Sequence, residues 1–242
     1  MYPIFKKEVR QFFGSLTGIM AIVVFLLLMG LLLFVFPDTS ILAYGYASLD
    51  NFFSLAPFVL LLLVPAITMR SFSDEFRAGT WEILATRPLS PGAIVAGKYA
   101  AALVVSILAL LPTLLYVFTI LSLSTDNSID GGGILGSYFG LLALVSLFTA
   151  VGVFCSALSA NAMVGFLLAA LGCYLLYAGF DAVSRIPVLA GGADYYMQQL
   201  GADAHYKSLS RGVLQLPDLL YFLLTTMLFL LLTRRLLLLK NQ

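Results

Sequence analysis

The stretch EFRAGTWEILATRPLSPGAIVAGK, from Glu75 to Lys98, is a polar island between two apolar runs of membrane length. It carries acids, bases, two prolines and the only tryptophan in a chain of 242 residues that is 61% hydrophobic. Two neighbouring membrane helices need only a few residues to connect them. A connection of this length and pattern therefore predicts a contact with another molecule.

The composition excludes a soluble globular protein. Charged residues make up 10% of the chain, against about 25% in ordinary globular domains, and the mean hydropathy is +1.02. A bilayer solvates that much apolar surface, at about 20 residues per crossing. Six runs are suitable: residues 17–36, 53–69, 93–121, 134–158, 162–180 and 219–232, the last continuing to 239. We predict an all-α integral membrane protein with six spans.

Lysines and arginines are concentrated on one side of these spans. With the N-terminus inside, the inner side holds ten Lys and Arg and four acids, net +6, whereas the outer side holds three and eight, net −5. Loops rich in Lys and Arg stay on the cytoplasmic side. The distribution predicts a multi-pass membrane protein with both termini and the polar island in the cytoplasm.

The first 16 residues predict a helix that lies in the inner membrane interface. Phe5, Val9 and Phe12 recur at helical spacing, and the opposite side carries basic residues, namely Lys6, Lys7 and Arg10. A helix of this kind buries its apolar face in membrane lipid and turns its basic face to anionic headgroups. The alternative is a plain cytoplasmic stub.

The predicted spans lack the residues of ion transport and of catalysis. No Asp, Glu, Lys, Arg or His lies deep in any of them, whereas ion-coupled transporters use such groups near the midplane. His205, the only histidine, is expected to be an ordinary surface residue, and Cys155 and Cys173 to be packing residues. We expect no catalytic residue, metal site or cofactor site in this chain.

Residues 92–98 match the pattern G-x-x-x-x-G-K of phosphate-binding loops. Position 99 is Tyr, where such a loop has Ser or Thr for magnesium, and no strand precedes the pattern. We therefore expect no nucleotide to bind here. The expected role of Lys98 is that of an anchor at the membrane interface, at the start of the third span.

Within the polar island, residues 73–84 predict a short helix. Ser73 is placed to cap it, and Asp74 and Glu75 fall in its first turn, where acids suit the helix dipole. Gly79 is a weak point, which a backbone break or a close approach by another chain would explain. The apolar surface of this helix consists of Phe72, Phe76, Trp81, Ile83 and Leu84, and the segment RPLSP at 87–91 ends it.

The order E-F-R-A-G-T-W-E-I-L-A-T-R-P-L-S, followed by G-K, resembles the loop between the second and third helices of ABC-2 type transporter permeases. The interfacial helix, the six spans and the long outer segment before the last span resemble the same family, as does S-R-G-V-L-Q-L-P-D-L-L-Y-F at 210–222. The resemblance covers essentially the whole chain. Within the family it is strongest to the GldF-type permease subunits associated with gliding motility.

The resemblance implies one permease domain over residues 1–242, with the type V exporter-like ABC-2 fold. Its parts would be an interfacial helix in 1–16, a cytoplasmic coupling-helix loop in 70–92 and an outer segment in 181–218 before the last helix. The implied function is that of an exporter subunit in which a separate ABC ATPase dimer binds ATP and magnesium. A second permease chain, non-identical by the gliding-motility resemblance, would complete the membrane part, with no nucleic-acid partner.

The coupling helix of this family seats in a groove of the ATPase. By the resemblance, polar contacts would come from Glu75, Arg77 and Glu82, and apolar ones from Phe76 and Trp81. The full set of ATPase-coupling residues implied for this chain is Asp74, Glu75, Phe76, Arg77, Gly79, Thr80, Trp81 and Glu82. The alternative is a helix adsorbed on the membrane with no partner.

Several questions remain open at the level of sequence. Within 181–218, residues 186–189 and 195–197 predict short helices that dip into the outer leaflet, with a solvated loop as the alternative. Small residues between Gly165 and Gly172 predict close helix packing or a dimer contact. Rival functions are a membrane scaffold of a motility or secretion machine, and an ion-independent channel. The transported substrate is not readable.

Overall fold

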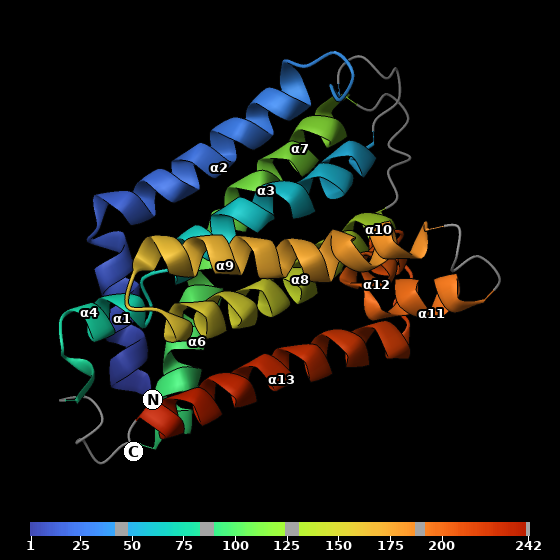
Figure 1. Cartoon of the computed structure of the whole chain (residues 1–242). Helices are drawn as coiled ribbons and strands as arrows, with labels where there is room; N and C mark the ends of the chain where they lie inside the picture. Colours follow the sequence, from blue (N-terminus) through green and yellow to red (C-terminus); the bar gives the residue numbers. More distant parts are fainter. Residues whose placement is uncertain (42–47, 83–89, 124–130, 187–191, 241–242) are drawn as a thin grey trace.

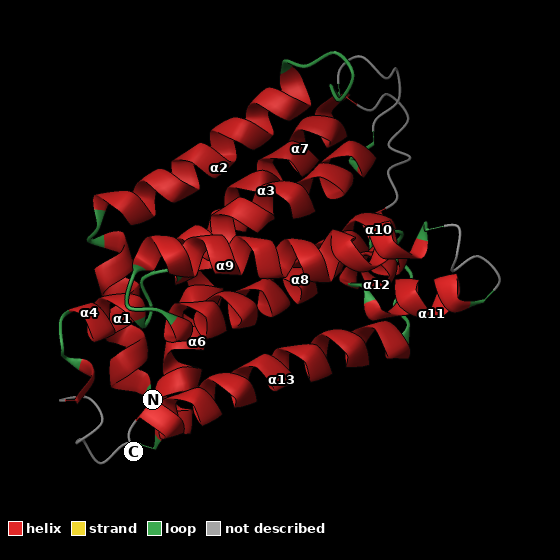
Figure 2. Ribbon diagram, viewed as in Figure 1, coloured by secondary structure: helices red, strands yellow, loops and turns green. Residues whose placement is uncertain are grey.

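A computed structural model describes residues 1–41, 48–82, 90–123, 131–186 and 192–240. The regular elements in these ranges are all helices (Figure 2). In chain order they are α1 (Tyr2–Phe13), α2 (Leu16–Phe34), α3 (Asp50–Thr68), α4 (Ser73–Arg77), α6 (Pro91–Leu110), η1 (Leu111–Thr113), α7 (Leu114–Leu123), α8 (Gly131–Leu158), α9 (Ala162–Tyr174), η2 (Leu175–Gly179), α10 (Phe180–Ser184), α11 (Ala193–Leu200), α12 (Ala202–Leu209) and α13 (Leu216–Lys240).

Six helical segments are long and apolar enough to cross a membrane, which confirms the predicted number of spans. They are Leu16–Phe34, Asp50–Arg77, Pro91–Ser122, Gly131–Leu158, Ala162–Ser184 and Leu216–Lys240. The bounds differ from the predicted ones mainly at the ends, where polar and interfacial residues continue the helices beyond the apolar runs. The predicted tight hairpin at 159–161 joins α8 and α9, which pack side by side.

Polar caps set the starts of three of these helices. The side chains of Ser15, Ser90 and Asn161 accept a hydrogen bond from a backbone N–H in the first turn of α2, α6 and α9. Each cap satisfies one of the donors that a helix leaves without a partner at its N-terminus. Short polar residues between apolar runs thus fix where these three spans begin.

Interior prolines have different effects in the second and third spans. Pro57 and Pro65 lie inside α3, and that helix continues through both. Pro112 lies in η1, a single 3₁₀ turn that separates α6 from α7. A proline removes one backbone donor and crowds the preceding turn, so the third span is divided here into two helices.

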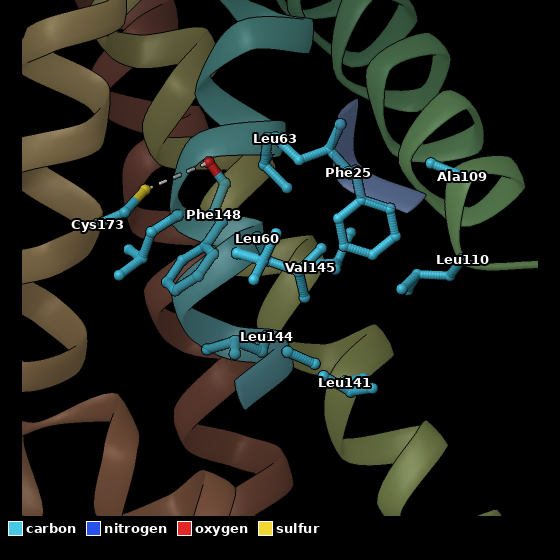
Figure 3. Packing of buried hydrophobic residues seen from close by; sticks show 14 of the residues in the cluster. Phe25, Leu60, Leu63, Ala109, Leu110, Leu141, Leu144, Val145, Phe148 and Cys173 are labelled. Carbon is cyan, nitrogen blue, oxygen red and sulfur yellow. Dashed lines mark hydrogen bonds between the residues drawn. The ribbon is translucent and has the colours of Figure 1, made fainter. Parts of the chain in front are cut away.

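The centre of the molecule is α8, which packs against α3, α6, α9 and α13. Leu141, Leu144, Val145 and Phe148 of this helix lie in the main core (Figure 3). Helix α8 approaches α3 closely at Gly152, where an added Cβ would lie 2.1 Å from Thr68 Oγ1. The absence of a side chain at this position therefore sets the distance between the two central spans.

The small residues of α9 also serve packing within the chain. A Cβ at Gly165 would contact Ser73, and one at Gly172 would contact Val151. The predicted close packing at 165–172 therefore involves the chain's own α4 and α8. Cys173 of the same helix is buried and reduced, and its thiol points to the Phe148 carbonyl oxygen at 3.9 Å (Figure 3).

Short elements gather at the two opposite ends of the bundle (Figure 1). Helices α1 and α4 lie at one end, together with the start of α6 and the last residues of α13. Helices α10, α11 and α12 lie at the other end, beside the start of α13. These two ends are named the α4 end and the α12 end below.

Candidate functional site

The α4 end holds the residues that the sequence singled out. Helix α4 follows α3 after a short turn and lies against α8 and α9 (Figure 1). Its five residues are far too few to be stable alone in water. Its position therefore depends on contacts with the spans, and these contacts fall into three groups.

The first group is a set of hydrogen bonds to Ser156, near the end of α8. Ser156 Oγ accepts from the backbone N–H of Phe72 at 2.8 Å and donates to the carbonyl oxygen of Met69 at 3.2 Å. In return, Ser73 Oγ donates to the carbonyl oxygen of Ser156 at 3.1 Å. These bonds satisfy backbone groups at the junction of α3 and α4 and fasten that junction to α8.

The second group is a buried ion cluster centred on Lys98 of α6. Its ammonium lies 2.8 Å from Glu8 Oε1 of α1 and 3.0 Å from Glu75 Oε1 of α4, and it donates to the Ser71 carbonyl oxygen. Lys7 of α1 also contacts Glu75 Oε1 at 3.0 Å. The Lys98 side chain is 1% exposed, so three oxygen partners replace the water that its charge has lost.

The third group is an aromatic cluster. The ring of Trp81 lies edge-on to those of Phe72 and Phe76, with centroids 6.0 and 5.6 Å away. Lys240, at the end of α13, lies 4.0 Å from the centre of the Phe76 ring and donates to the Ala157 carbonyl oxygen at 2.8 Å. Cation–π and edge-to-face contacts each add stability beyond burial alone, and here they join α4 to α13.

A Schellman motif ends α4. The N–H of Thr80 bonds to the carbonyl oxygen of Glu75 at 3.0 Å, and that of Gly79 to Phe76 at 3.3 Å. Gly79 has φ +67°, a left-handed conformation that glycine adopts at little cost. This conformation fits the backbone break, one of the two predicted explanations for this glycine, and an added Cβ at Gly79 would meet nothing of this chain within 4 Å.

The predicted coupling residues divide into exposed and buried ones. Arg77, Gly79, Thr80 and Glu82 are exposed, and Asp74 and Phe76 are half-buried. Glu75 and Trp81 are buried, 8% and 6% exposed. The sequence predicted polar and apolar ATPase contacts for these two, and in the structure they lie in the chain's own ion and aromatic clusters. Ile83, Leu84 and residues 87–89 lie outside the described residues.

Two further expectations at this end need correction. Ser73 is not the N-cap of α4, since Phe72 holds that position and Ser73 is the first helical residue, bonded to Ser156. Lys98 is not a surface anchor at the interface, because its ammonium is buried among carboxylates. The matching G-x-x-x-x-G-K pattern lies wholly within α6, so its backbone forms a helix rather than a phosphate-binding loop.

Sequence reasoning missed four residues of this site. Glu8, Ser156 and Lys240 had no assigned contact and Lys7 was assigned only to lipid headgroups, although each binds α4 or a residue beside it. One signal was available, namely a lone acid, Glu8, in a basic N-terminal segment. Its partner Lys98 lies 90 positions along the chain, a pairing that sequence spacing does not indicate.

The α12 end corrects another expectation, that of a surface His205. The ring of His205 is buried between the Asp218 carboxylate, 2.7 Å from Nδ1, and the Gln199 carbonyl oxygen, 2.9 Å from Nε2. It also stacks on Tyr221 with 4.1 Å between ring centres. This residue therefore joins α12 to the start of α13.

The predicted outer segment contains helices α11 and α12 rather than a plain loop. Tyr195–Met197 falls within α11, as expected, and residues 187–189 of the other predicted helix lie outside the described residues. Tyr206 of α12 donates to the Phe53 carbonyl oxygen at 2.6 Å. Burial raises the pKa of Tyr206 well above its ordinary value, and Tyr177 and Asp203 raise it further, so its hydroxyl stays protonated as the donor.

In the described part of the chain, no three His, Cys, Asp or Glu residues group as metal ligands. The fold and the α4 site define a multi-pass helical membrane protein with a short helix tied to several spans. Residues 5–178 match the family described as ABC-2 family transporter protein, and the chain belongs to that family. Permeases of this family work with an ABC ATPase. No curated protein matches the chain.

Proposed function

We propose that this chain is the membrane-spanning permease subunit of an ATP-driven ABC-2 exporter, with α4 as the coupling helix. In this role the partner ATPase binds ATP and magnesium, and the permease converts the ATPase's closure into movement of its spans. The observation that carries the proposal is the attachment of α4 to α1, α6, α8 and α13 by hydrogen bonds, ion pairs and cation–π contacts.

A displacement of α4 is transmitted through contacts that resist stretching. An ion pair joins Glu75 to Lys98 of α6, and a hydrogen bond joins Ser73 to Ser156 of α8. A cation–π contact joins Phe76 to Lys240 at the end of α13. Buried ion pairs hold their partners tightly, since separating them leaves unpaired charges in a dry environment. The spans at the α4 end therefore move together with α4.

The ATPase contact in this proposal is the exposed turn that follows α4. Arg77, Thr80 and Glu82 are exposed there, and Gly79 ends α4 in a left-handed conformation. Glu75 and Trp81 support this turn from inside. Among the predicted coupling residues, we therefore propose that the exposed ones contact the ATPase and that the buried ones hold the turn in place.

The charge distribution supports a cytoplasmic α4 end, since the loops of this end contain most of the Lys and Arg. The proposed location is the bacterial inner membrane. The proposed assembly is two permease chains on an ATPase dimer, with a second, non-identical permease. The resemblance to GldF-type subunits supports a link to gliding motility and export.

The proposal is tested by affinity purification of the tagged chain in mild detergent from its native membrane. We expect mass spectrometry to identify a P-loop ATPase with the wild type. The double charge reversal Arg77→Glu/Glu82→Lys should reduce its recovery about tenfold or more, because both contacts become like-charge pairs. The matched control is Gln199→Lys, which adds a charge to an exposed position at the α12 end and should leave the recovery unchanged.

The same eluate distinguishes the alternatives. A second permease sequence among the recovered chains supports the heterodimer, and its absence with full ATPase recovery supports a homodimer. Loss of the ATPase from the wild type, under conditions that preserve other membrane complexes, contradicts the proposal and favours a scaffold or channel. Equal recovery by wild type and double variant contradicts the assignment of the exposed turn as the contact.

A further inference from the structure

A cavity of about 580 Å³ opens at the α12 end, away from the ATPase-coupling site. Helix α3 forms one wall, η2 and α10 form the second, and α12 with the residues after it closes the end. The two walls belong to neighbouring spans, because α3 packs against α9. The cavity therefore lies between membrane helices and reaches the surface of the bundle.

The α3 wall changes from charged to apolar along one helical face. Asp50, Ser54 and Phe58 occur at intervals of four residues and are exposed in the described chain, so they lie above one another on the helix. At 1.5 Å per residue, Phe58 is about 12 Å deeper along the helix than Asp50. One end of this wall is thus hydrophilic and the other is apolar at membrane depth.

The opposite wall contains a π-helical turn. Residues Leu175–Gly179 form η2, between α9 and α10, and this turn places Tyr177 and Ala178 at the cavity. Single π turns inside α-helices occur frequently at functional sites. The Tyr177 ring meets that of Phe58 edge-on, with 5.6 Å between the centres, so aromatic side chains from both walls form the deep part of the cavity.

Some charged residues at the mouth form ion pairs with each other and others do not. Arg185 pairs with Asp181 at 2.6 Å, and Lys207 pairs with Asp203 at 2.5 Å. Asp50 and Arg211 also line the cavity, and neither forms an ion pair in the described part of the chain. The mouth thus presents one unpaired anion and one unpaired cation, separated by more than ion-pair distance.

We propose that this cavity binds the zwitterionic headgroup of a phospholipid of the phosphatidylethanolamine type. Its phosphate binds Arg211, its ammonium binds Asp50, and the start of one acyl chain lies between Phe58 and Tyr177. A single ligand with both charges satisfies both unpaired side chains, and the apolar depth accommodates the chain. Aromatic residues with one apolar side and one wet side are common at the level of lipid headgroups.

This inference concerns the α12 end alone and does not depend on the ATPase. A purely anionic lipid leaves Asp50 facing a like charge, which disfavours it. A purely apolar molecule leaves both charges unpaired at the mouth and gains nothing from them. A soluble zwitterion satisfies the charges but leaves the aromatic depth unused.

The test is lipid titration of the delipidated, detergent-purified protein, followed by native mass spectrometry. The probe is short-chain phosphatidylethanolamine, compared with short-chain phosphatidylglycerol, diacylglycerol and free O-phosphoethanolamine. We expect phosphatidylethanolamine to bind at least about tenfold more tightly than the other three. Asp50→Asn and Arg211→Gln should each weaken its binding about tenfold, the usual size of a lost charge-assisted hydrogen bond.

Matched controls separate the site from general effects on the fold. Asp50→Glu and Arg211→Lys keep the charges and should bind as the wild type does within about threefold. Asp194→Asn removes a charge at the same end but outside the cavity, and it should have no effect. Unchanged affinity in both Asp50→Asn and Arg211→Gln overturns the proposal.

The comparison ligands decide the chemistry. If phosphatidylglycerol binds as tightly as phosphatidylethanolamine, Asp50 does not bind an ammonium group and the ligand need not be a zwitterion. Equal binding of O-phosphoethanolamine overturns the lipid and identifies a soluble ligand of the same charges. If diacylglycerol binds as tightly as phosphatidylethanolamine, the charged residues at the mouth do not contribute to binding.

Discussion

At the scale of single residues, Lys98 connects more elements than any other side chain discussed above. Its ammonium binds Glu8 of α1, Glu75 of α4 and the carbonyl oxygen of Ser71, and it lies 4.9 Å from the centre of the Phe72 ring. A buried ammonium is costly without such partners. The cluster is therefore stable only when α1, α4 and α6 are all in place.

The substitution Lys98→Met tests this dependence. It removes the buried cation between the Glu8 and Glu75 carboxylates and leaves them only Lys7, whose side chain is exposed. We expect a loss of roughly 3 kcal/mol of stability, the usual cost of removing one partner of a buried ion pair. The measurement is thermal unfolding of the purified protein in detergent.

A control variant and a double variant show whether the loss of stability comes from the ion cluster. Arg10→Met, at an exposed position of α1, should change stability by less than about 0.5 kcal/mol. The double variant Glu8→Gln/Lys98→Met should lose less than the sum of its two single variants, because the two residues share one interaction. Additive losses, or a fully stable Lys98→Met, would show that the cluster contributes little.

Residue roles were the level at which sequence reasoning was least accurate. Lys98 was expected at the interface and His205 at the surface, yet both are buried. The reason is the distance between partners along the chain, since Lys98 finds Glu8 90 positions away. From the sequence alone, a charged residue at the end of an apolar run is interpreted as an interfacial anchor, because its counterion is identified only in the folded structure.

At the scale of elements, the end of α4 determines where the exposed turn points. The Schellman motif places Gly79 at φ +67°, and the chain then continues to Thr80, Trp81 and Glu82. Gly79 has no neighbour within 4 Å that would clash with a side chain. Substitutions here therefore change the backbone conformation without a steric clash inside this chain.

The pair Gly79→Ala and Gly79→Asn tests this conformation. We expect Gly79→Ala to destabilise the turn by about 1 kcal/mol, the cost of a left-handed residue with a Cβ. Gly79→Asn should lose less, because Asn tolerates this conformation better. The readouts are the unfolding temperature and the recovery of the ATPase in affinity purification.

If both variants recover the same amount of ATPase, the result contradicts a role for the backbone conformation of Gly79 in docking. Equal ATPase recovery by Gly79→Ala, Gly79→Asn and the wild type would mean that the direction of the turn is unimportant for docking. A larger loss in Gly79→Asn than in Gly79→Ala would mean that the side chain itself clashes with the partner. Only the predicted order supports a role for backbone conformation.

Elements themselves were well predicted because their signals are local. The apolar runs matched six spans to within a few residues at most ends, and the polar residues Ser15, Ser90 and Asn161 begin three of the helices. For Pro112, which lies in the third predicted span, the sequence alone does not decide whether the proline breaks the helix or is tolerated in it. That decision depends on whether neighbouring helices can accept a break, which is a tertiary property.

At the scale of the whole molecule, the two ends of the bundle are chemically different. The α4 end holds basic loops and the proposed ATPase contact, whereas the α12 end holds the cavity with Asp50 and Arg211. The proposed orientation places the α4 end in the cytoplasm. This placement makes the coupling site and the lipid cavity face opposite sides of the membrane.

Cysteine labelling tests this orientation. Thr80→Cys and Tyr196→Cys place a thiol at exposed positions of the α4 end and the α12 end. In right-side-out spheroplasts, we expect a membrane-impermeant maleimide to label Tyr196→Cys and to label Thr80→Cys only after permeabilisation. The wild type is the control, since its two cysteines, Cys155 and Cys173, are buried. The reverse labelling pattern would reject the orientation and the proposed ATPase contact together.

The sequence by itself determined the class of this protein, the number of spans and the segment that we propose as the coupling site. These properties follow from composition and from patterns within some 20 residues, the length of one bilayer crossing. Only the tertiary structure decided that Glu75 and Trp81 are buried, that Lys98 is the centre of an ion cluster, and that a cavity opens between α3 and η2. The physical reason is that burial, ion pairing and cavities arise between helices, from residues far apart in the chain.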